Sequence, residues 1–233
     1  MKKLMLVIVA LAGAAVGYWV SSRAGSEDAS PKEATAKEAA AQVSIPADAQ
    51  LAWYPWTDCP ICGMELGDAP VNATSGGELV RLCSDGCAEK FQADPQPVLA
   101  KREAAIREAQ GPLYALTVCP VSGEELGSMG DATEHVFGSR LVRFCCDHCV
   151  PKFVADPAAA FAQIDSAAVQ AQLAVYPTDE CPVMEGMKLD SMGTPKNVLW
   201  NGRLVRLCCD SCTEDFAKDP AAYVAKVWGP QGT

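Results

Sequence analysis

The fold is decided by one stretch, Leu79-Val80-Arg81-Leu82-Cys83-Ser84-Asp85-Gly86-Cys87, because it returns twice further along the chain. Related strings occupy residues 141–149 and 204–212, and each copy continues to a phenylalanine and then to an Asp-Pro pair. A Cys-Pro pair precedes each copy, and a tyrosine precedes that cysteine by five positions. The 12 cysteines of the chain fall four to a copy. Self-similarity of this kind identifies a tandem array of one small unit.

Three cysteines recur in every copy, and they are named here by position. The first cysteine belongs to the Cys-Pro pair, the strand-end cysteine ends the apolar stretch, and the helix cysteine follows four residues later. In the order first, strand-end and helix, they are Cys59, Cys83 and Cys87, then Cys119, Cys145 and Cys149, then Cys181, Cys208 and Cys212. We divide the array into module 1 (residues 51–110), module 2 (residues 111–172) and module 3 (residues 173–233).

Each unit is predicted to contain a cysteine knuckle, a β-hairpin and two helices, which is an α+β arrangement. The hairpin signal is clearest at residues 196–200 and 203–207, where Asn201-Gly202 separates two apolar runs. The helix cysteine then opens a short helix that carries the phenylalanine. The Asp-Pro pair starts a second helix, with Asp as the N-cap and Pro at the first helical position. These second helices are expected at residues 95–110, 157–172 and 220–227.

The cysteines need a chemical explanation, because a unit of about 40 residues is too small to be held by a hydrophobic core alone. Module 1 has a Cys59-x2-Cys62 knuckle and a Cys83-x3-Cys87 pair. The knuckle places two thiolates on one side of a turn, and the second pair completes the tetrahedron that Zn²⁺ adopts with thiolates. A helix start also favours thiolate over thiol. The pattern predicts a metal site, with one ion in each module.

Modules 2 and 3 lack the second knuckle cysteine, and Ser122 and Met184 stand in its place. Each gains instead a cysteine directly after the strand-end cysteine, Cys146 in module 2 and Cys209 in module 3. Adjacent cysteines rarely face one ion together, so these two are secondary ligand candidates. Three well-placed thiolates therefore remain in each of these modules.

Three methionines surround the knuckle of module 3, namely Met184, Met187 and Met192. Three soft sulfurs with a nearby thioether suit Cu(I) better than a closed zinc site. The same methionines equally fit a gap-filling role in a small core. The sequence leaves both interpretations open.

Structural disulfides are the main alternative to metal. An even number of cysteines in an exported protein is also typical of a disulfide framework, and four cysteines allow three pairings. The C-P-x-C-G turn and the i, i+4 pair at a helix start favour metal, because they aim sulfurs at one point. We expect Zn²⁺ or Cu(I), with oxidation of a metal-free form as a competing outcome.

The combined pattern resembles the YHS and TRASH families, which are small, cysteine-rich, treble-clef-like modules implicated in heavy-metal binding, trafficking and sensing. The resemblance lies in Cys119-Pro-Val-Ser-Gly, in Arg140-Leu-Val-Arg-Phe-Cys-Cys-Asp-His-Cys, and in Phe153 with Asp156-Pro157. It covers most of residues 51–228, three times over. It implies that the first, strand-end and helix cysteines of each module are metal ligands.

One arginine in each hairpin lies two residues before the strand-end cysteine: Arg81, Arg143 and Arg206. This spacing places arginine and cysteine on the same strand face. The guanidinium could lower a thiolate pKa by charge proximity, or it could simply cover the hairpin. Both interpretations stay open at this point.

The N-terminus has the layout of an export signal. Lys2 and Lys3 precede an uncharged apolar run at residues 4–20. We expect residues 1–24 to be a membrane anchor or a cleaved signal peptide, with the anchor favoured. Residues 25–50 read as a flexible tether, because they are rich in Ala, Glu and Lys and poor in large apolar residues. The modules would then lie on the periplasmic or extracellular face.

Charge and motif content exclude several function classes. The net charge of −10 provides no basic field for phosphate backbones, so nucleic-acid binding is disfavoured. No nucleophile–base set or phosphate loop occurs in the sequence, so an enzyme is not expected. The favoured function is to bind, buffer or pass on a heavy-metal ion. Expected partners are metal ions, the membrane through the N-terminal helix, and another metal-handling or redox protein. A thiol–disulfide exchange protein and a stapled interaction scaffold are the alternatives.

Overall fold

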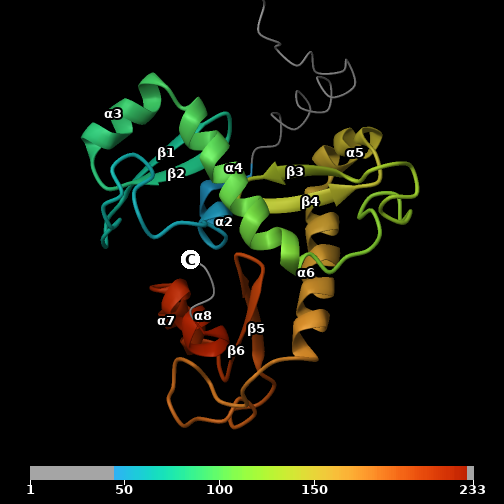
Figure 1. Cartoon of the computed structure of the whole chain (residues 1–233). Coiled ribbons are helices and arrows are strands. Elements are labelled where there is room, and N and C mark those ends of the chain that lie inside the picture. Colours follow the sequence, from blue (N-terminus) through green and yellow to red (C-terminus); the bar gives the residue numbers. More distant parts are fainter. Residues whose placement is uncertain (1–44, 230–233) are drawn as a thin grey trace, which may run out of the picture.

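The computed structural model describes residues 45–229 of the chain, in which helices alternate with three small antiparallel sheets. Figure 1 shows the three hairpins as separate units, with α4 lying between the first two and α6 leading to the third. This mixture agrees with the predicted α+β class. In chain order the elements are α2 (Ala47–Leu51), β1 (Val71–Ser75), β2 (Glu78–Leu82), α3 (Asp85–Ala93), α4 (Gln96–Gln110), β3 (Thr133–Phe137), β4 (Arg140–Phe144), α5 (Val150–Ala155), α6 (Pro157–Leu173), β5 (Lys196–Trp200), β6 (Arg203–Leu207), α7 (Ser211–Phe216) and α8 (Pro220–Trp228).

Each sheet is a single hairpin closed by a two-residue turn. In module 3 the register pairs Trp200 with Arg203, and the turn residues Asn201 and Gly202 have φ angles of 47° and 82°. Two successive positive φ angles match the right-handed twist of the strands, which is why Asn-Gly is favoured at this turn. The strands predicted at residues 196–200 and 203–207 are confirmed.

The second helices begin within one residue of the predicted positions, but the predicted Asp cap is complete in module 3 alone. Asp156 is the N-cap of α6 as predicted, yet its side chain makes no capping hydrogen bond. Asp219 caps α8 as expected, since its carboxylate accepts a hydrogen bond from Ala222 N at 3.1 Å. In module 1 the helix begins at Gln96, one residue later than predicted, and Pro95 is the N-cap. The residue three positions after Asp94 is Pro97, which has no N–H, so Asp94 lacks the donor that Ala222 provides to Asp219 in α8.

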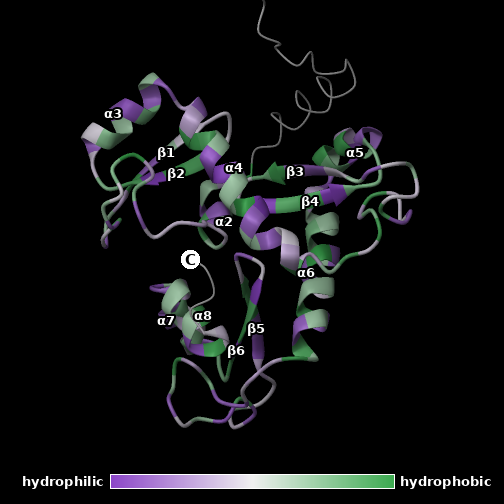
Figure 2. Ribbon diagram, viewed as in Figure 1, coloured by the Kyte–Doolittle hydropathy of each residue, from purple (hydrophilic) through white to green (hydrophobic). Residues whose placement is uncertain are grey.

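Every module has its own small apolar core, built from the second strand and the short helix that follows it. Phe91, Phe153 and Phe216 are buried in these three cores. The second strand buries alternate and neighbouring residues against them, such as Leu79, Val80 and Leu82 in module 1. Because they are buried, these phenylalanines are packing residues. Figure 2 shows purple and green segments mixed along α3 and α4, whereas α6 is mostly pale green.

A buried glutamine at the end of a preceding helix clamps each hairpin. In module 3, Gln172 Nε2 donates to Gly202 O at 2.8 Å, and Leu204 N donates to Gln172 Oε1 at 2.9 Å. The same two bonds recur from Gln110 to Ser139 and Leu141, and from Gln50 to Gly77 and Leu79. Sequence analysis overlooked these glutamines, although each lies four residues before a recurrent tyrosine.

The hydroxyl of that tyrosine accepts a further hydrogen bond from the second strand of each hairpin. The backbone N–H of Arg81, Arg143 and Arg206 donates to the hydroxyl of Tyr54, Tyr114 and Tyr176 at 2.9, 3.2 and 2.8 Å. These N–H groups and those bound by the glutamines lie on the free edge of β2, β4 and β6. The edge donors are thus satisfied without a third strand.

Modules 1 and 2 are joined through a buried arginine of α4. Arg102 is 2% exposed and donates to Gly138 O at 2.6 Å and Ser139 Oγ at 2.9 Å in the second hairpin turn. It also pairs with Glu78 at the start of β2. Because Glu78 in turn accepts from Gly138 N at 3.2 Å, the tips of the two hairpins share one polar contact.

The predicted anchor or signal peptide and residues 25–44 of the predicted tether lie outside the described residues. The end of that tether differs from the prediction, because α2 forms at Ala47–Leu51 and buries Gln50 against the first hairpin. Among residues 45–229, no helix combines the length and apolar character needed to cross a bilayer.

Replacing Gln172 by Ala should loosen the third hairpin selectively. The substitution leaves the buried Leu204 N–H and the buried Gly202 C=O without hydrogen-bond partners. We therefore expect the free energy of local opening to fall by about 2 kcal/mol, which corresponds to roughly 30-fold faster amide exchange at Leu204. Hydrogen exchange followed by mass spectrometry on β5–β6 measures it. Gln170→Ala, on the exposed face of the same helix, is the control; equal exchange in the two variants would refute the clamp.

Candidate metal centres

The first cysteine of each module lies in a tight loop framed by a backbone bridge. Asp58 pairs with Glu65 in module 1, and equivalent bridges frame the other two loops. Within the loop, Cys59 N donates to Met64 O at 2.7 Å and Gly63 N donates to Cys59 O at 2.8 Å. Gly63 has a φ of 73°, a conformation that a side chain would strain, so glycine is required where the loop turns back. The predicted knuckle is thus present.

The strand-end and helix cysteines meet at the junction between the hairpin and the short helix. Their sulfurs lie 3.8 Å apart in module 1, between Cys83 and Cys87, and 3.7 Å apart in modules 2 and 3. The strand-end cysteine directly follows the second strand. The helix cysteine lies in the first turn of α3 or α7, or, for Cys149, in the 3-10 turn (Asp147–Cys149) that leads into α5, so the backbone reversal brings both sulfurs to one side.

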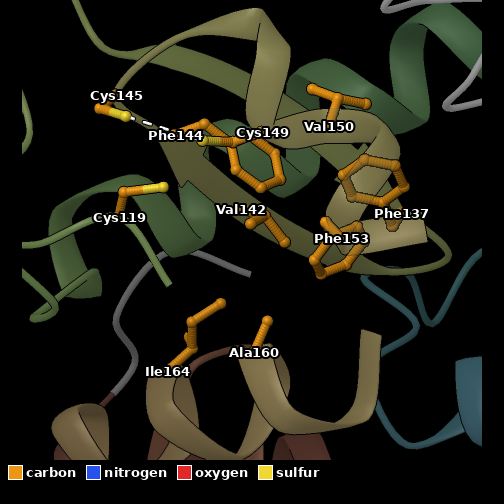
Figure 3. Close-up of a cluster of buried hydrophobic side chains, with 10 residues drawn as sticks. All are labelled: Cys119, Phe137, Val142, Phe144, Cys145, Cys149, Val150, Phe153, Ala160 and Ile164. Atoms are coloured by element: carbon orange, nitrogen blue, oxygen red, sulfur yellow. Dashed lines mark hydrogen bonds between the residues drawn. The ribbon is translucent and has the colours of Figure 1, made fainter. Parts of the chain in front are cut away.

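All three segments converge in every module. The sulfurs of the first, strand-end and helix cysteines lie within 4.8 Å of one another in each of three groups. Tetrahedral Zn²⁺ with bonds of about 2.3 Å sets sulfurs about 3.8 Å apart, close to the observed spacing. Figure 3 shows this for module 2, where Cys119, Cys145 and Cys149 point toward one another beside the aromatic core. Each group has the size and chemistry to hold a metal ion.

A fourth side chain approaches each group from the knuckle, and we call its position the fourth corner. Cys62 Sγ lies 3.4 Å from Cys83 Sγ in module 1 and belongs to the metal-sized group there. Ser122 Oγ lies 3.3 Å from Cys145 Sγ, and Met184 Sδ lies 3.9 Å from Cys208 Sγ. The structure therefore puts Ser122 and Met184 where module 1 has Cys62, as the alignment of the repeats implied.

The remaining candidates lie beside the groups. Cys146 Sγ is 3.9 Å from Cys145 Sγ, and Cys209 Sγ is 3.9 Å from Cys208 Sγ and 3.3 Å from Cys212 Sγ. Neither belongs to the sulfur group that contains the first cysteine of its module. Met187 packs against the core of module 3, and Met192 is 61% exposed. Among residues 45–229, Met184 is the methionine whose sulfur contacts the sulfur group of module 3, so the gap-filling interpretation holds for Met187.

All 12 cysteines are free thiols in the structure. The closest pair named above is 3.3 Å apart, whereas a disulfide bond is about 2.05 Å long. The sulfurs thus lie near enough to bind one ion together, and their distances are those of the reduced protein.

The knuckle backbone favours ionisation of the first cysteine. Burial alone would raise the pKa of Cys59, but three backbone N–H groups donate to its sulfur and lower the pKa from 9.0 to about 6. Two of them belong to the knuckle, at Ile61 and Cys62, and one belongs to Cys83. A thiolate is the form that binds metal, so the loop prepares one ligand before any ion arrives.

The same arrangement recurs in the other modules. Burial raises the pKa of Cys119, but the Ser122 hydroxyl and three backbone N–H groups lower it to about 7. Burial also opposes ionisation of Cys181, and the N–H groups of Cys208, Met184 and Val183 again lower its pKa. The first cysteine is thus the prepared ligand in all three modules.

The strand-end and helix cysteines of each group have raised pKa values, so their sulfurs are held protonated. The hydrogen bond with Cys62 and then burial raise the pKa of Cys83 to about 12, and burial followed by Cys119 and Cys145 raises that of Cys149 to about 12. The pKa of Cys212 is also raised, chiefly by burial. Close thiolates repel one another, so full ionisation needs a cation at the centre, and binding must release protons.

The three hairpin arginines cover tyrosines. Arg81 lies 5.8 Å from the ring centre of Tyr54, and Arg143 and Arg206 lie 4.9 and 5.7 Å from the tyrosines of their own modules. No arginine is among the main causes of the shifts in the first-cysteine pKa values. The structure therefore favours the covering role over thiolate activation.

Comparison with known proteins adds no family assignment, since no protein-family model, curated protein or solved structure matches the chain at a significant level.

In the metal-free, reduced protein, Cys209 should be alkylated well below pH 9. Its thiolate accepts a hydrogen bond from the Ser211 hydroxyl, which with the Cys212 backbone lowers its pKa from 9.0 to about 7, and it is partly exposed. A lowered pKa means more thiolate at pH 7 and faster reaction with iodoacetamide. Peptide mapping across pH 6–10 should give half-maximal reactivity near pH 7, moved upward in Ser211→Ala; identical profiles for the two proteins would contradict this.

Proposed function

We propose that the chain is a metal-binding protein that binds, buffers or passes on Zn²⁺ or Cu(I) through thiolate clusters, with one ion per module. The supporting observation is the threefold convergence of sulfurs from separate segments to within 4.8 Å. Three repeats with the same sulfur spacing are hard to explain by packing alone, because buried thiols need no common centre to fill a core.

The resemblance to the YHS and TRASH families supports the same proposal. A knuckle, a hairpin and a helix that contribute the first, strand-end and helix cysteines form a treble-clef-like unit. Membership of those families is part of the proposal, as is export to the periplasmic or extracellular face by residues 1–24. A membrane or a metal-handling protein would be the partner there, and no enzymatic role is proposed.

Thiol–disulfide exchange is the second candidate, and one observation favours it. Cys209 and Cys212 form a C-x-x-C pair whose sulfurs are 3.3 Å apart, with Cys209 partly exposed and its pKa lowered by Ser211. A redox potential in the range of exchange proteins would support this role. A stapled scaffold would instead hold its ions without exchanging them.

Metal titration of the full-length, reduced chain tests the proposal. Under anaerobic conditions, native mass spectrometry should show uptake of about one ion per module, with loss of the ions on acidification as thiolates are protonated. Transfer of Cu(I) to a competing chelator would favour a carrier over a scaffold. Failure of the reduced protein to bind Zn²⁺ or Cu(I) would overturn the proposal.

Single substitutions should remove single ions. Cys149→Ser deletes one of three thiolates of module 2, and we expect that module to lose at least about 100-fold in affinity, taking roughly 3 kcal/mol per thiolate. The matched change Cys146→Ser, next to the group but outside it, should retain all ions. Equal losses in the two variants, measured by chelator competition, would show that the assigned ligands are wrong.

A further inference from the structure

The three centres share a backbone and differ at one side chain. Cys62, Ser122 and Met184 each lie three residues after the first cysteine. Their backbone N–H groups all stabilise that cysteine's thiolate. Their side chains all reach the strand-end sulfur, at 3.4, 3.3 and 3.9 Å. The fourth corner is therefore one structural position with three different donors.

The fourth corner is also the solvent-facing part of each centre. The first and helix cysteines are buried in every module, whereas Cys62 and Ser122 are exposed and Met184 is 39% exposed. The first, strand-end and helix cysteines are thus common to all three modules. The donor at the fourth corner completes the ligand shell of the ion, and it lies on the side from which solvent reaches the ion.

The three donors differ in charge and softness. Cys62 gives module 1 a fourth anionic thiolate, which is the set found in closed structural zinc sites. Met184 offers a neutral thioether, which adds little for a divalent ion but suits Cu(I), whose single charge is already more than neutralised by three thiolates. Ser122 offers a neutral hydroxyl that is hydrogen-bonded to Cys145, so module 2 also presents three thiolates.

The loop of module 3 is adapted to its longer side chain. Its knuckle is one residue longer, so Cys181 N donates to Met187 O, six residues on, rather than five residues on as in module 1. An extra turn closes from Met187 N to Met184 O at 3.0 Å. The insertion keeps Met184 at the fourth corner instead of displacing it.

We propose that the chain binds two kinds of ion at once, with Zn²⁺ in module 1 and Cu(I) in modules 2 and 3. This rests on the proposed function and adds which ion each module takes. The thioether of Met184 and the hydroxyl of Ser122, in place of a fourth thiolate at this position, make modules 2 and 3 the soft, three-thiolate sites. Module 1 is then the closed site and the others are the ones open to ion transfer.

A competition experiment on the full-length, reduced chain tests this. Zn²⁺ and Cu(I), each at three equivalents under anaerobic conditions, should give a native mass that corresponds to about one zinc and about two copper ions. Uptake of one and the same ion by all three modules would overturn the inference and leave the proposed function standing. Binding of neither ion would overturn both.

Exchange of the fourth-corner donor locates the ions. Met184→Cys and Ser122→Cys should each raise the zinc count by one, and Cys62→Ser should lower it by one. Met192→Cys is the matched control, because it adds a thiol to the same module at a side chain that is 61% exposed, and it should leave the count unchanged. Amide exchange of the hairpins checks that each variant is folded. A zinc count that responds equally to Met184→Cys and Met192→Cys, or to neither, contradicts the assignment.

Discussion

The close approach of sulfurs from three segments is the constraint on which each module depends. A knuckle, a strand end and the first turn of a helix must meet so that their sulfurs lie within 4.8 Å of one another. Each module has only a small apolar core beneath this point, which includes the recurrent buried phenylalanine Phe91, Phe153 or Phe216. In so small a unit, a shared ion would fix the relative positions of loop, hairpin and helix more firmly than the core does. Without a cation, most of these sulfurs are held protonated by one another and by burial.

The modules are linked by helices that belong to two neighbours. Helix α4 packs Val98 into the core of module 1 and ends with Gln110 on the second hairpin. Helix α6 likewise begins in the core of module 2 and reaches the third hairpin through Gln172. The hairpins of modules 2 and 3 are therefore held at their free edge by a helix of the preceding module. Each module thus contacts the next one along the chain, as the units of other repeat proteins do.

Much of this architecture follows from the sequence, and the exceptions have physical reasons. The hairpins were predictable because Gly76-Gly77 and Asn201-Gly202 allow two positive φ angles and Gly138 allows one. The sulfur groups were predictable because a Cys-Pro pair followed by a C-x3-C pair occurs three times. Asp94 is not the N-cap of α4, and Pro97 supplies no N–H at the position that Ala222 occupies relative to Asp219. The buried Gln50 was placed in a tether because α2 is short and polar, and only the tertiary contact with the first hairpin explains its burial. The roles of Met184 and Met187 could not be separated, because spacing alone does not say which side chain faces the sulfurs.

The central claim is that each set of sulfurs forms the shell of one ion. X-ray absorption at the metal edge of the loaded, full-length protein tests this most directly, because it counts and identifies the nearest ligand atoms. The account predicts a shell dominated by sulfur at about 2.3 Å for every bound ion. A shell dominated by nitrogen or oxygen at about 2.0–2.2 Å would contradict it.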